Sequence, residues 1–259
     1  MKALWSVVIF FFVLGITPAT YGHTIFVDGD LSDWGIAVTT FGANGNNWSS
    51  PYPDVYVSQE DWVGNNGYVG PGFGGQPYDA EALLMTWDAQ NLYLALATGF
   101  NLQGQDYYGT TTYPGDLLID LHNDHSYDLA YVFNNVDRPS LPPGLYQIDS
   151  SLALENTQYY AASDPFRLDP NGAFYTYIAS GTSTYIVDST IPRSVLEVQI
   201  PWDALGNYYG PLNVHWTMWC GNDALDLTAV HTPEPASFLL VGTALIFLIS
   251  WSHRRYRLH

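Results

Sequence analysis

The chain has 259 residues, and its 25 Asp and Glu against 7 Lys and Arg give a formal net charge of −18. Four of the bases lie at the two ends (Lys2, Arg254, Arg255 and Arg257), so the region between them has three arginines and no lysine. Nucleic-acid binding needs clustered Lys and Arg and is therefore excluded, as is chemistry that uses an internal lysine amine. A disordered acidic chain is excluded too, because 20 Tyr, 12 Phe and 9 Trp provide a large apolar surface to bury.

Residues 1–22 have the pattern of a secretory signal peptide. Lys2 precedes an apolar run over residues 7–15, and small residues follow up to Gly22. We predict cleavage by signal peptidase after Gly22, so that the exported chain begins at His23. The alternative is an N-terminal membrane anchor, but the apolar run is short for a membrane span.

Residues 23–232 are predicted to form one all-β domain, an antiparallel β-sandwich of the jelly-roll type. Short segments rich in Val, Ile, Tyr and Leu alternate with turn residues, and no segment keeps a helical period over three turns. Residues 82–87 and 92–98 flank a compact turn and predict a hairpin. Further strands are predicted at residues 116–121, 127–133, 184–187, 195–201 and 214–220.

Two glycine-rich or polar regions, residues 42–77 and 102–114, are predicted to be long surface loops, where recognition sites concentrate. The first contains the candidate carbohydrate-binding residues Trp48, Tyr52, Tyr56 and Trp62. Exposed aromatic rings stack on sugars, while neighbouring amide and carboxylate groups bond the hydroxyls. The alternative is that these rings fold back into a small core beneath the loop.

A polar turn between two predicted strands is a candidate Ca²⁺ site. Asp120, Asn123, Asp124 and Asp128 supply oxygen ligands, which Ca²⁺ accepts in flexible geometry. The alternative is that these side chains cap the hairpin turn. His122 and His125 in the same turn suggest Zn²⁺ less well, because no third close ligand is identifiable.

A second candidate metal site consists of Asp28, Asp30 and Asp33 beside a glycine. It lacks the full EF-hand pattern, because Thr39 stands where the bidentate Glu would be. The alternative is again a turn capped by Asp side chains. Ca²⁺ is the one cofactor that the sequence suggests, and no organic cofactor is indicated.

Paired carboxylates raise the question of catalysis. Asp79 with Glu81, or Asp116 with Asp120, could face one another as in glycosidases, but acids are so abundant here that such pairs arise by chance. No nucleophile motif is present. We therefore predict no enzyme activity and no catalytic residues. Cys220, the single cysteine, is predicted to be a buried thiol.

Residues 233–259 combine three elements in order at the C-terminus: a Pro-Glu-Pro motif, an apolar helix and a basic end. This order resembles the PEP-CTERM sorting signal of exported proteins in Gram-negative bacteria that make extracellular polysaccharide. The resemblance implies an initial anchor in the inner membrane and processing near the motif by an exosortase, whereas the alternative is a plain single-pass anchor. The elements are Pro233, Glu234 and Pro235, then residues 236–252, then residues 253–257 with Arg254, Arg255 and Arg257.

The segment from Val27 to Trp34, Val-Asp-Gly-Asp-Leu-Ser-Asp-Trp, resembles the start of family-nine carbohydrate-binding modules and their DOMON-like relatives, which are β-sandwiches. Later segments fit in order, at residues 87–94, 115–120 and 197–205. The paired tryptophans that clamp sugar in binding members have no assigned counterpart here. The resemblance implies the fold and does not by itself imply a ligand.

Together these features predict an exported, non-enzymatic protein of the cell surface or the extracellular biofilm matrix. It is expected to interact with polysaccharide and to be stabilised by Ca²⁺. One alternative is a structural matrix or adhesion protein without a sugar site. A weaker alternative is a glycan-processing enzyme that uses paired carboxylates.

Overall fold

The structure is a computed structural model that describes residues 24–37, 45–107, 109–188 and 193–232. Residues 23–231 form one compact unit. The predicted signal peptide, membrane helix and sorting motif lie outside the described residues. None of the helices in the described part of the chain is long and apolar enough to cross a membrane.

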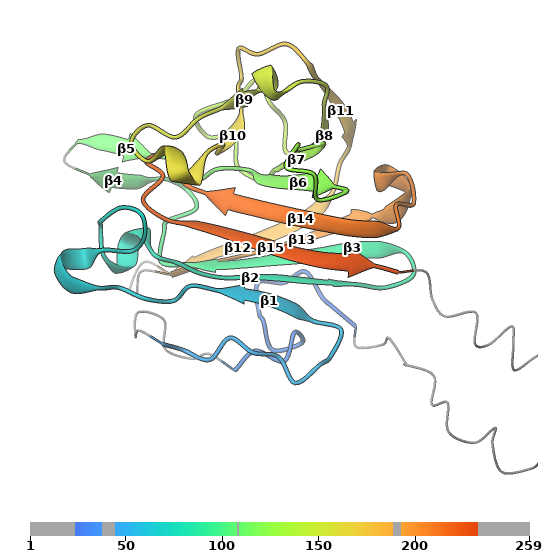
Figure 1. Ribbon diagram of the computed structural model, residues 1–259, viewed down its shortest axis with the longest axis horizontal. Helices are drawn as coiled ribbons and strands as arrows, with labels where there is room; N and C mark the ends of the chain where they lie inside the picture. The colour runs from blue at the N-terminus through green and yellow to red at the C-terminus, as the bar shows by residue number, and fades with distance from the viewer. Residues whose placement is uncertain (1–23, 38–44, 108, 189–192, 233–259) are drawn as a thin grey trace, which may run out of the picture. The chain divides into compact units, whose positions relative to one another are not determined.

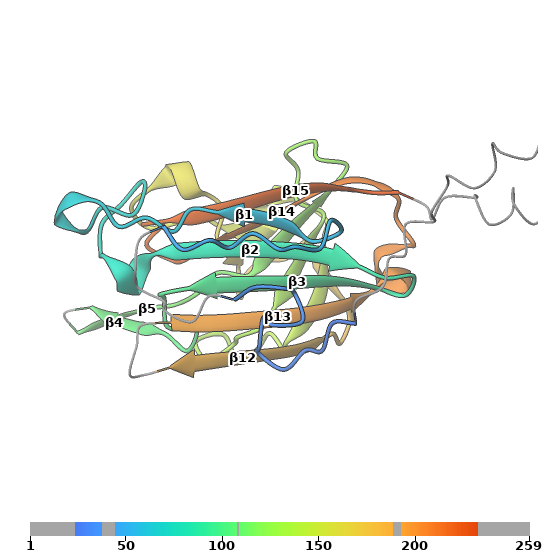
Figure 2. The same ribbon diagram turned by 90° about the horizontal axis from the view of Figure 1, so that it is seen from below.

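Two antiparallel sheets pack face to face (Figures 1 and 2). The five-stranded sheet has the order β1-β2-β3-β13-β12, with bounds Tyr56–Gln59, Ala80–Trp87, Asn91–Thr98, Arg193–Pro201 and Thr182–Asp188. The six-stranded sheet has the order β11-β8-β7-β6-β14-β15, with bounds Tyr175–Ala179, Gly144–Ile148, Leu129–Val132, Leu117–Leu121, Gly210–Thr217 and Ala224–His231. The fold is therefore all-β, as the sequence predicts.

Two short hairpin-like pairs and five 3-10 turns complete the described elements. The pairs are β4 (Gln105–Tyr107) with β5 (Thr110–Thr112), and β9 (Leu154–Glu155) with β10 (Arg167–Leu168). The turns are η1 (Asn65–Gly67), η2 (Gln76–Tyr78), η3 (Ser151–Ala153), η4 (Ala161–Ser163) and η5 (Trp202–Leu205).

Strand β3 shows why the central strands read as nearly continuous apolar runs. Successive side chains of a strand point to opposite faces. Leu92, Leu94 and Leu96 pack into the core between the two sheets, whereas Ala95 and Ala97 enter a second core on the outer face of the five-stranded sheet. Both faces of β3 are buried, so the polar alternation of a surface strand is absent.

The segment of residues 24–36 covers that outer face with Ile25, Leu31, Trp34 and Ile36. On the opposite side of the molecule, a third core covers the outer face of the six-stranded sheet and includes Leu168 of β10. These outer coverings bury the second face of the central strands, whereas β11 and β15 keep exposed residues.

The predicted hairpin is confirmed, since β2 pairs with β3 and Trp87 faces Leu92. The two regions predicted to be long surface loops contain short strands, because β1 lies within residues 42–77 and the β4–β5 pair lies within residues 102–114. Strand β15 was not predicted. Its buried and exposed residues alternate from Leu225 to His231, and in the sequence apolar and polar residues alternate from Leu225 to Ala229.

Candidate functional site

Three acids meet at one end of the two packed sheets. Glu60 follows the last residue of β1, Asp79 precedes the first residue of β2, and Asp223 precedes the first residue of β15. One ligand oxygen from each lies within 4.8 Å of the other two. Because β1 and β2 run antiparallel, the end of one strand lies beside the start of the other, and the β14–β15 turn of the second sheet completes the cluster.

Asp223 links the two sheets at this point. Its Oδ2 accepts a 2.7 Å hydrogen bond from the Ala80 N–H in β2, and its Oδ1 accepts a 2.8 Å bond from the Ala224 N–H. Burial raises the pKa of the Asp223 carboxyl, and the nearby charges of Glu60 and Asp79 raise it further. A carboxylate here is therefore costly unless a positive charge accompanies it.

Asp79 is fully buried, and neither of its carboxylate oxygens has a hydrogen-bond partner. Burial raises the pKa of Asp79 to about 7, with a further increase from the charge of Asp61. The Trp62 N–H lies near enough to lower this pKa, but it does not meet hydrogen-bond geometry with either oxygen. Glu60 Oε2 is likewise buried without a partner, and burial together with Asp79 raises the pKa of Glu60.

Two more acids flank the cluster in sequence. Asp61 Oδ2 accepts a 3.0 Å hydrogen bond from the Trp48 indole N–H, and Glu81 accepts one from the Gln76 side-chain amide. No base compensates this charge among the arginine side chains that the structure describes. Those two side chains, Arg138 and Arg167, pair with Asp116, Asp137 and Glu155.

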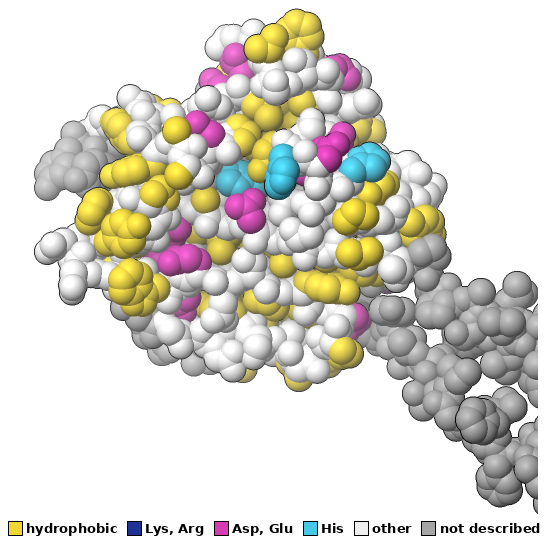
Figure 3. Space-filling view, in the orientation of Figure 1, with side chains coloured by type: hydrophobic (Ala, Val, Ile, Leu, Met, Phe, Trp, Pro, Cys, Tyr) yellow, Lys and Arg dark blue, Asp and Glu magenta, His cyan; other side chains and the backbone are white. Residues whose placement is uncertain are grey.

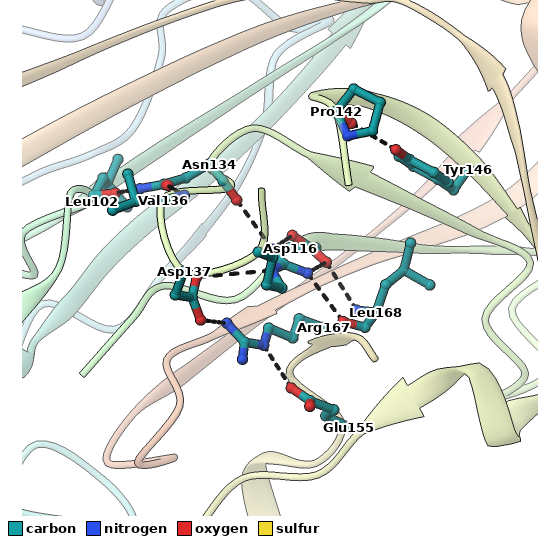
Figure 4. Close-up of polar contacts among 11 residues, drawn as sticks. Leu102, Asp116, Asn134, Val136, Asp137, Pro142, Tyr146, Glu155, Arg167 and Leu168 are labelled. Carbon is teal, nitrogen blue, oxygen red and sulfur yellow. Dashed lines mark hydrogen bonds and ion pairs between the residues drawn. The ribbon is translucent and has the colours of Figure 1, made fainter. Parts of the chain in front are cut away.

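The Asp116 pair shows how this protein neutralises a buried acid elsewhere (Figure 4). Arg138 Nη1 and Nη2 donate to Asp116 at 2.8 and 2.6 Å, a bidentate arrangement, and both side chains are buried. The Leu168 N–H adds a 2.9 Å bond to the same carboxylate. Asp116 is therefore fully compensated, in contrast to Asp79.

A cavity of about 550 Å³ is lined by residues that adjoin the acid cluster in sequence. Two of them, Tyr78 and Asn222, directly precede Asp79 and Asp223. This volume is in the range of small-molecule sites. Aromatic and polar side chains share the walls. The aromatic ones are Phe73, Tyr78, Tyr159, Tyr160 and Trp219, and the polar ones include Thr110, Thr112 and Asn222.

An exposed row of rings continues from the cavity. Trp62 packs edge-on against Tyr68, which packs edge-on against Phe73 of the cavity wall, with ring centroids 6.4 and 5.2 Å apart. Trp62 and Phe73 are 52% and 51% exposed, so about half of each side chain is accessible to a ligand. Figure 3 shows hydrophobic side chains gathered at the left end of the molecule, where the loop after β1 lies, with acidic side chains beside them.

Backbone contacts fix the loop that carries Tyr68 and Phe73. Gly72 donates a 2.7 Å hydrogen bond to the Asn222 carbonyl, and the Asn222 side-chain amide donates to the Phe73 carbonyl. A Cβ on Gly72 would lie 2.6 Å from the Asn222 Cα and 2.7 Å from the Tyr160 ring. The close approach requires glycine, and it holds the aromatic loop against the β14–β15 turn.

The predicted carbohydrate-binding residues separate in the structure. Trp62 is exposed, and Tyr52 is 37% exposed. Tyr56 is half-buried and stacks on Trp87, with ring centroids 5.2 Å apart, so one of its faces is covered. The prediction for Trp48 is corrected: its side chain is fully buried in the outer core and cannot stack on a ligand.

The predicted Ca²⁺ turn contains side chains that bond the backbone. Asp120 is buried and accepts the Asp124 and His125 N–H groups, and Asp128 accepts the Leu121 N–H at 2.7 Å. Asn123 and Asp124 are exposed. These bonds agree with the turn-capping alternative, and Ca²⁺ at this turn remains a prediction.

At the second predicted metal site, the Asp side chains also accept hydrogen bonds from backbone N–H groups. Asp28 accepts the Asp30 N–H, Asp30 accepts the Ser32 N–H, and Asp33 accepts the Phe26 N–H. Asp28 and Asp30 thus cap their own turns, whereas Asp33 bonds a residue seven positions earlier. Ca²⁺ at these residues likewise remains a prediction.

The structure does not assemble the two carboxylate pairs as isolated acid–base pairs. Asp116 is held by Arg138, and Asp79 belongs to the cluster with Glu60 and Asp223. Sequence reasoning missed Glu60 and Asp223, because their meeting with Asp79 depends on sheet packing. Cys220 is a free, buried cysteine, as predicted, and burial raises the pKa of its thiol to about 11.

Comparison with known proteins identifies one segment of the chain. Residues 231–255 match the PEP-CTERM protein-sorting motif, which indicates an exported, envelope-associated protein of a Gram-negative bacterium that an exosortase processes. No match was found among curated proteins or among solved structures. The resemblance of residues 27–34 to carbohydrate-binding modules therefore has no support from a family or structural neighbour.

Proposed function

We propose that this protein acts outside the cell, at the surface or in the extracellular matrix, by binding polysaccharide in the aromatic cavity. The observation that carries the proposal is the cavity of about 550 Å³ with five aromatic residues and several hydroxyl and amide groups in its walls. Sugar rings present apolar faces and polar edges, and both kinds of surface are available there.

The row of Trp62, Tyr68 and Phe73 extends the aromatic surface beyond the cavity. A polymer of several sugar units can therefore contact the cavity and the row together, whereas a single sugar fills only the cavity. The acidic character of the chain disfavours anionic polymers, because like charges repel. The proposed ligand is a neutral polysaccharide, bound without turnover.

The sorting motif begins at His231, the last residue of β15, so the folded unit is followed at once by the processing signal. Export by the predicted signal peptide, followed by sorting through this motif, would bring the cavity to the extracellular polysaccharide. The predicted signal peptide and membrane helix belong to the same proposal, since both precede release outside the cell.

The test measures binding of the exported protein to neutral polysaccharides by affinity electrophoresis. We expect Phe73→Ala and Tyr159→Ala to weaken retention at least tenfold, because each removes a ring from the cavity wall. Phe26→Ala is the matched control, since Phe26 is 63% exposed but belongs to the N-terminal segment. Equal retention of all three variants, or no retention of the wild-type protein on any polymer, would overturn the proposal.

A further inference from the structure

We propose that Glu60, Asp79 and Asp223 bind a divalent cation, with Ca²⁺ as the expected ion, at the junction of the two sheets. The inference goes beyond polysaccharide binding, because it concerns a different set of side chains and a different ligand. It also differs from the two acidic turns that the sequence suggests as Ca²⁺ sites.

The spacing of the three acids suits a common ligand. Their ligand oxygens lie within 4.8 Å of one another, so a point exists within about 2.8 Å of all three. Ca²⁺ binds oxygen at about 2.3–2.6 Å, which small side-chain adjustments would reach. The acids come from two sheets and three chain segments, so their convergence is a product of the fold.

Asp79 supplies a second, independent observation. It is the one fully buried acid among the described residues for which neither oxygen has a hydrogen-bond donor. Buried polar groups are almost always bonded, and a buried acid without partners requires an explanation. A bound cation provides one, because its charge takes the place that Arg138 has beside Asp116.

The donor set selects the kind of ion. Three carboxylates and no Cys or His side chain in the group favour a hard cation over Zn²⁺. Ligands from three separate segments form an irregular set, which suits Ca²⁺ better than the strict octahedron of Mg²⁺. Outside the cell Ca²⁺ is also available at the concentrations that weak extracellular sites require.

A cation here would stabilise the end of the molecule that carries the aromatic residues. Asp79 follows η2, Glu60 precedes the loop with Trp62 and Tyr68, and Asp223 lies in the turn that holds that loop. The ion would therefore connect both ends of the loop to the β14–β15 turn. Its removal is expected to loosen this loop before it affects the rest of the domain.

The test titrates Ca²⁺ into the full exported protein after removal of metal with EDTA, by isothermal calorimetry and by thermal unfolding. We expect the wild-type protein to bind Ca²⁺ and to gain thermal stability. Asp79→Asn should weaken binding more than tenfold and abolish the stabilisation. In EDTA, however, this variant should unfold at the same or a higher temperature than the wild type, because it removes an unpaired buried charge. The matched control Asp203→Asn removes an exposed acid of η5 that belongs to none of the candidate metal sites, and it should behave like the wild type. Asp124→Asn tests the acidic turn as the alternative location of the ion.

Glu60→Gln provides a second variant if Asp79→Asn does not fold, with the same expected loss of binding. The proposal is wrong if Ca²⁺ neither binds to nor stabilises the wild-type protein. It is also wrong if Asp124→Asn loses Ca²⁺ while Asp79→Asn keeps it, since the ion would then occupy the turn. Polysaccharide retention is measured separately, so that a failure of the cavity proposal does not affect this result.

Discussion

The indole N–H of Trp34 donates a 2.6 Å hydrogen bond to Glu197 Oε1, and both side chains are fully buried. The other oxygen, Glu197 Oε2, accepts the backbone N–H groups of Asp28 and Gly29. One carboxylate of β13 thus fixes the N-terminal segment on the outer face of the five-stranded sheet. The acidic segment of residues 27–34 has a structural role here that depends on a residue far away in the sequence.

Glu197→Gln is predicted to destabilise the folded protein by about 1–3 kcal/mol, because the amide NH₂ cannot accept the hydrogen bonds that one of the oxygens accepts. The free energy of unfolding in urea at pH 6 measures the loss. In a Trp34→Phe background the same substitution should cost less, since the indole donor is absent. Equal costs in both backgrounds would show that the Trp34 bond is unimportant.

Stability should also depend on pH through Glu197, whose pKa burial raises from 4.5 to about 7. Between these values the folded state holds a proton that the unfolded state releases. The stabilisation is therefore complete below about pH 4.5 and is lost as the pH rises through 7, with a slope of at most about 1.4 kcal/mol per pH unit. Urea unfolding from pH 5 to 8 in EDTA should show the difference between wild type and Glu197→Gln shrinking as the pH rises. A stability difference that stays constant over this pH range would contradict the raised pKa of Glu197.

Because Arg138 and Asp116 form a buried ion pair, we expect the effects of substituting them on the free energy of unfolding to be strongly coupled. Arg138→Ala leaves the Asp116 carboxylate buried without its guanidinium partner and should cost about 3–5 kcal/mol of unfolding free energy. Asp116→Ala removes the bidentate partner of the buried guanidinium and should also be destabilising, although Arg138 keeps a 4.0 Å contact with Asp137. The double variant should lose clearly less than the sum of the two, because neither charge then remains. Additive losses in urea unfolding would argue against the pair as the source of the effect.

If an exosortase processes the chain at the sorting motif, substitutions in the motif should change the mass of the exported protein. Replacing Pro233, Glu234 and Pro235 by alanine should block exosortase processing, so that the exported chain keeps its C-terminal residues and stays with the membrane fraction. Mass spectrometry and fractionation of the producing bacterium measure both effects. Glu155→Ala is the control, since it changes an acid outside the motif. Normal processing of the alanine variant would contradict the role of the motif.

Local patterns account for much of what could be predicted. The β2–β3 hairpin follows from two apolar runs and a turn in which Asp88 bonds the Gln90 and Asn91 N–H groups, all within a few residues. The turn-capping alternative for Asp28 and Asp30 is local in the same way. Strand β15 was accessible to the same reasoning, because its alternation is visible in the sequence.

The solvent exposure of individual aromatic residues could not be predicted from local sequence patterns. Trp48 and Trp62 occur in the same glycine-rich region, yet one is fully buried and the other is 52% exposed. Asp61 Oδ2 binds the Trp48 indole, and the outer core encloses the ring. Nothing in the neighbouring residues distinguishes the two, because burial depends on which distant surface each ring meets.

The sequence by itself determined the all-β class and the C-terminal sorting signal, since strand period and short motifs are local properties. Tertiary structure alone decided which acids come together. Asp223 lies 144 residues after Asp79, and their carboxylates meet because the β14–β15 turn packs against the start of β2. Whether an acid is neutralised by Arg138, as Asp116 is, or left without a partner, as Asp79 is, depends on packing between sheets and coverings, which no local pattern encodes.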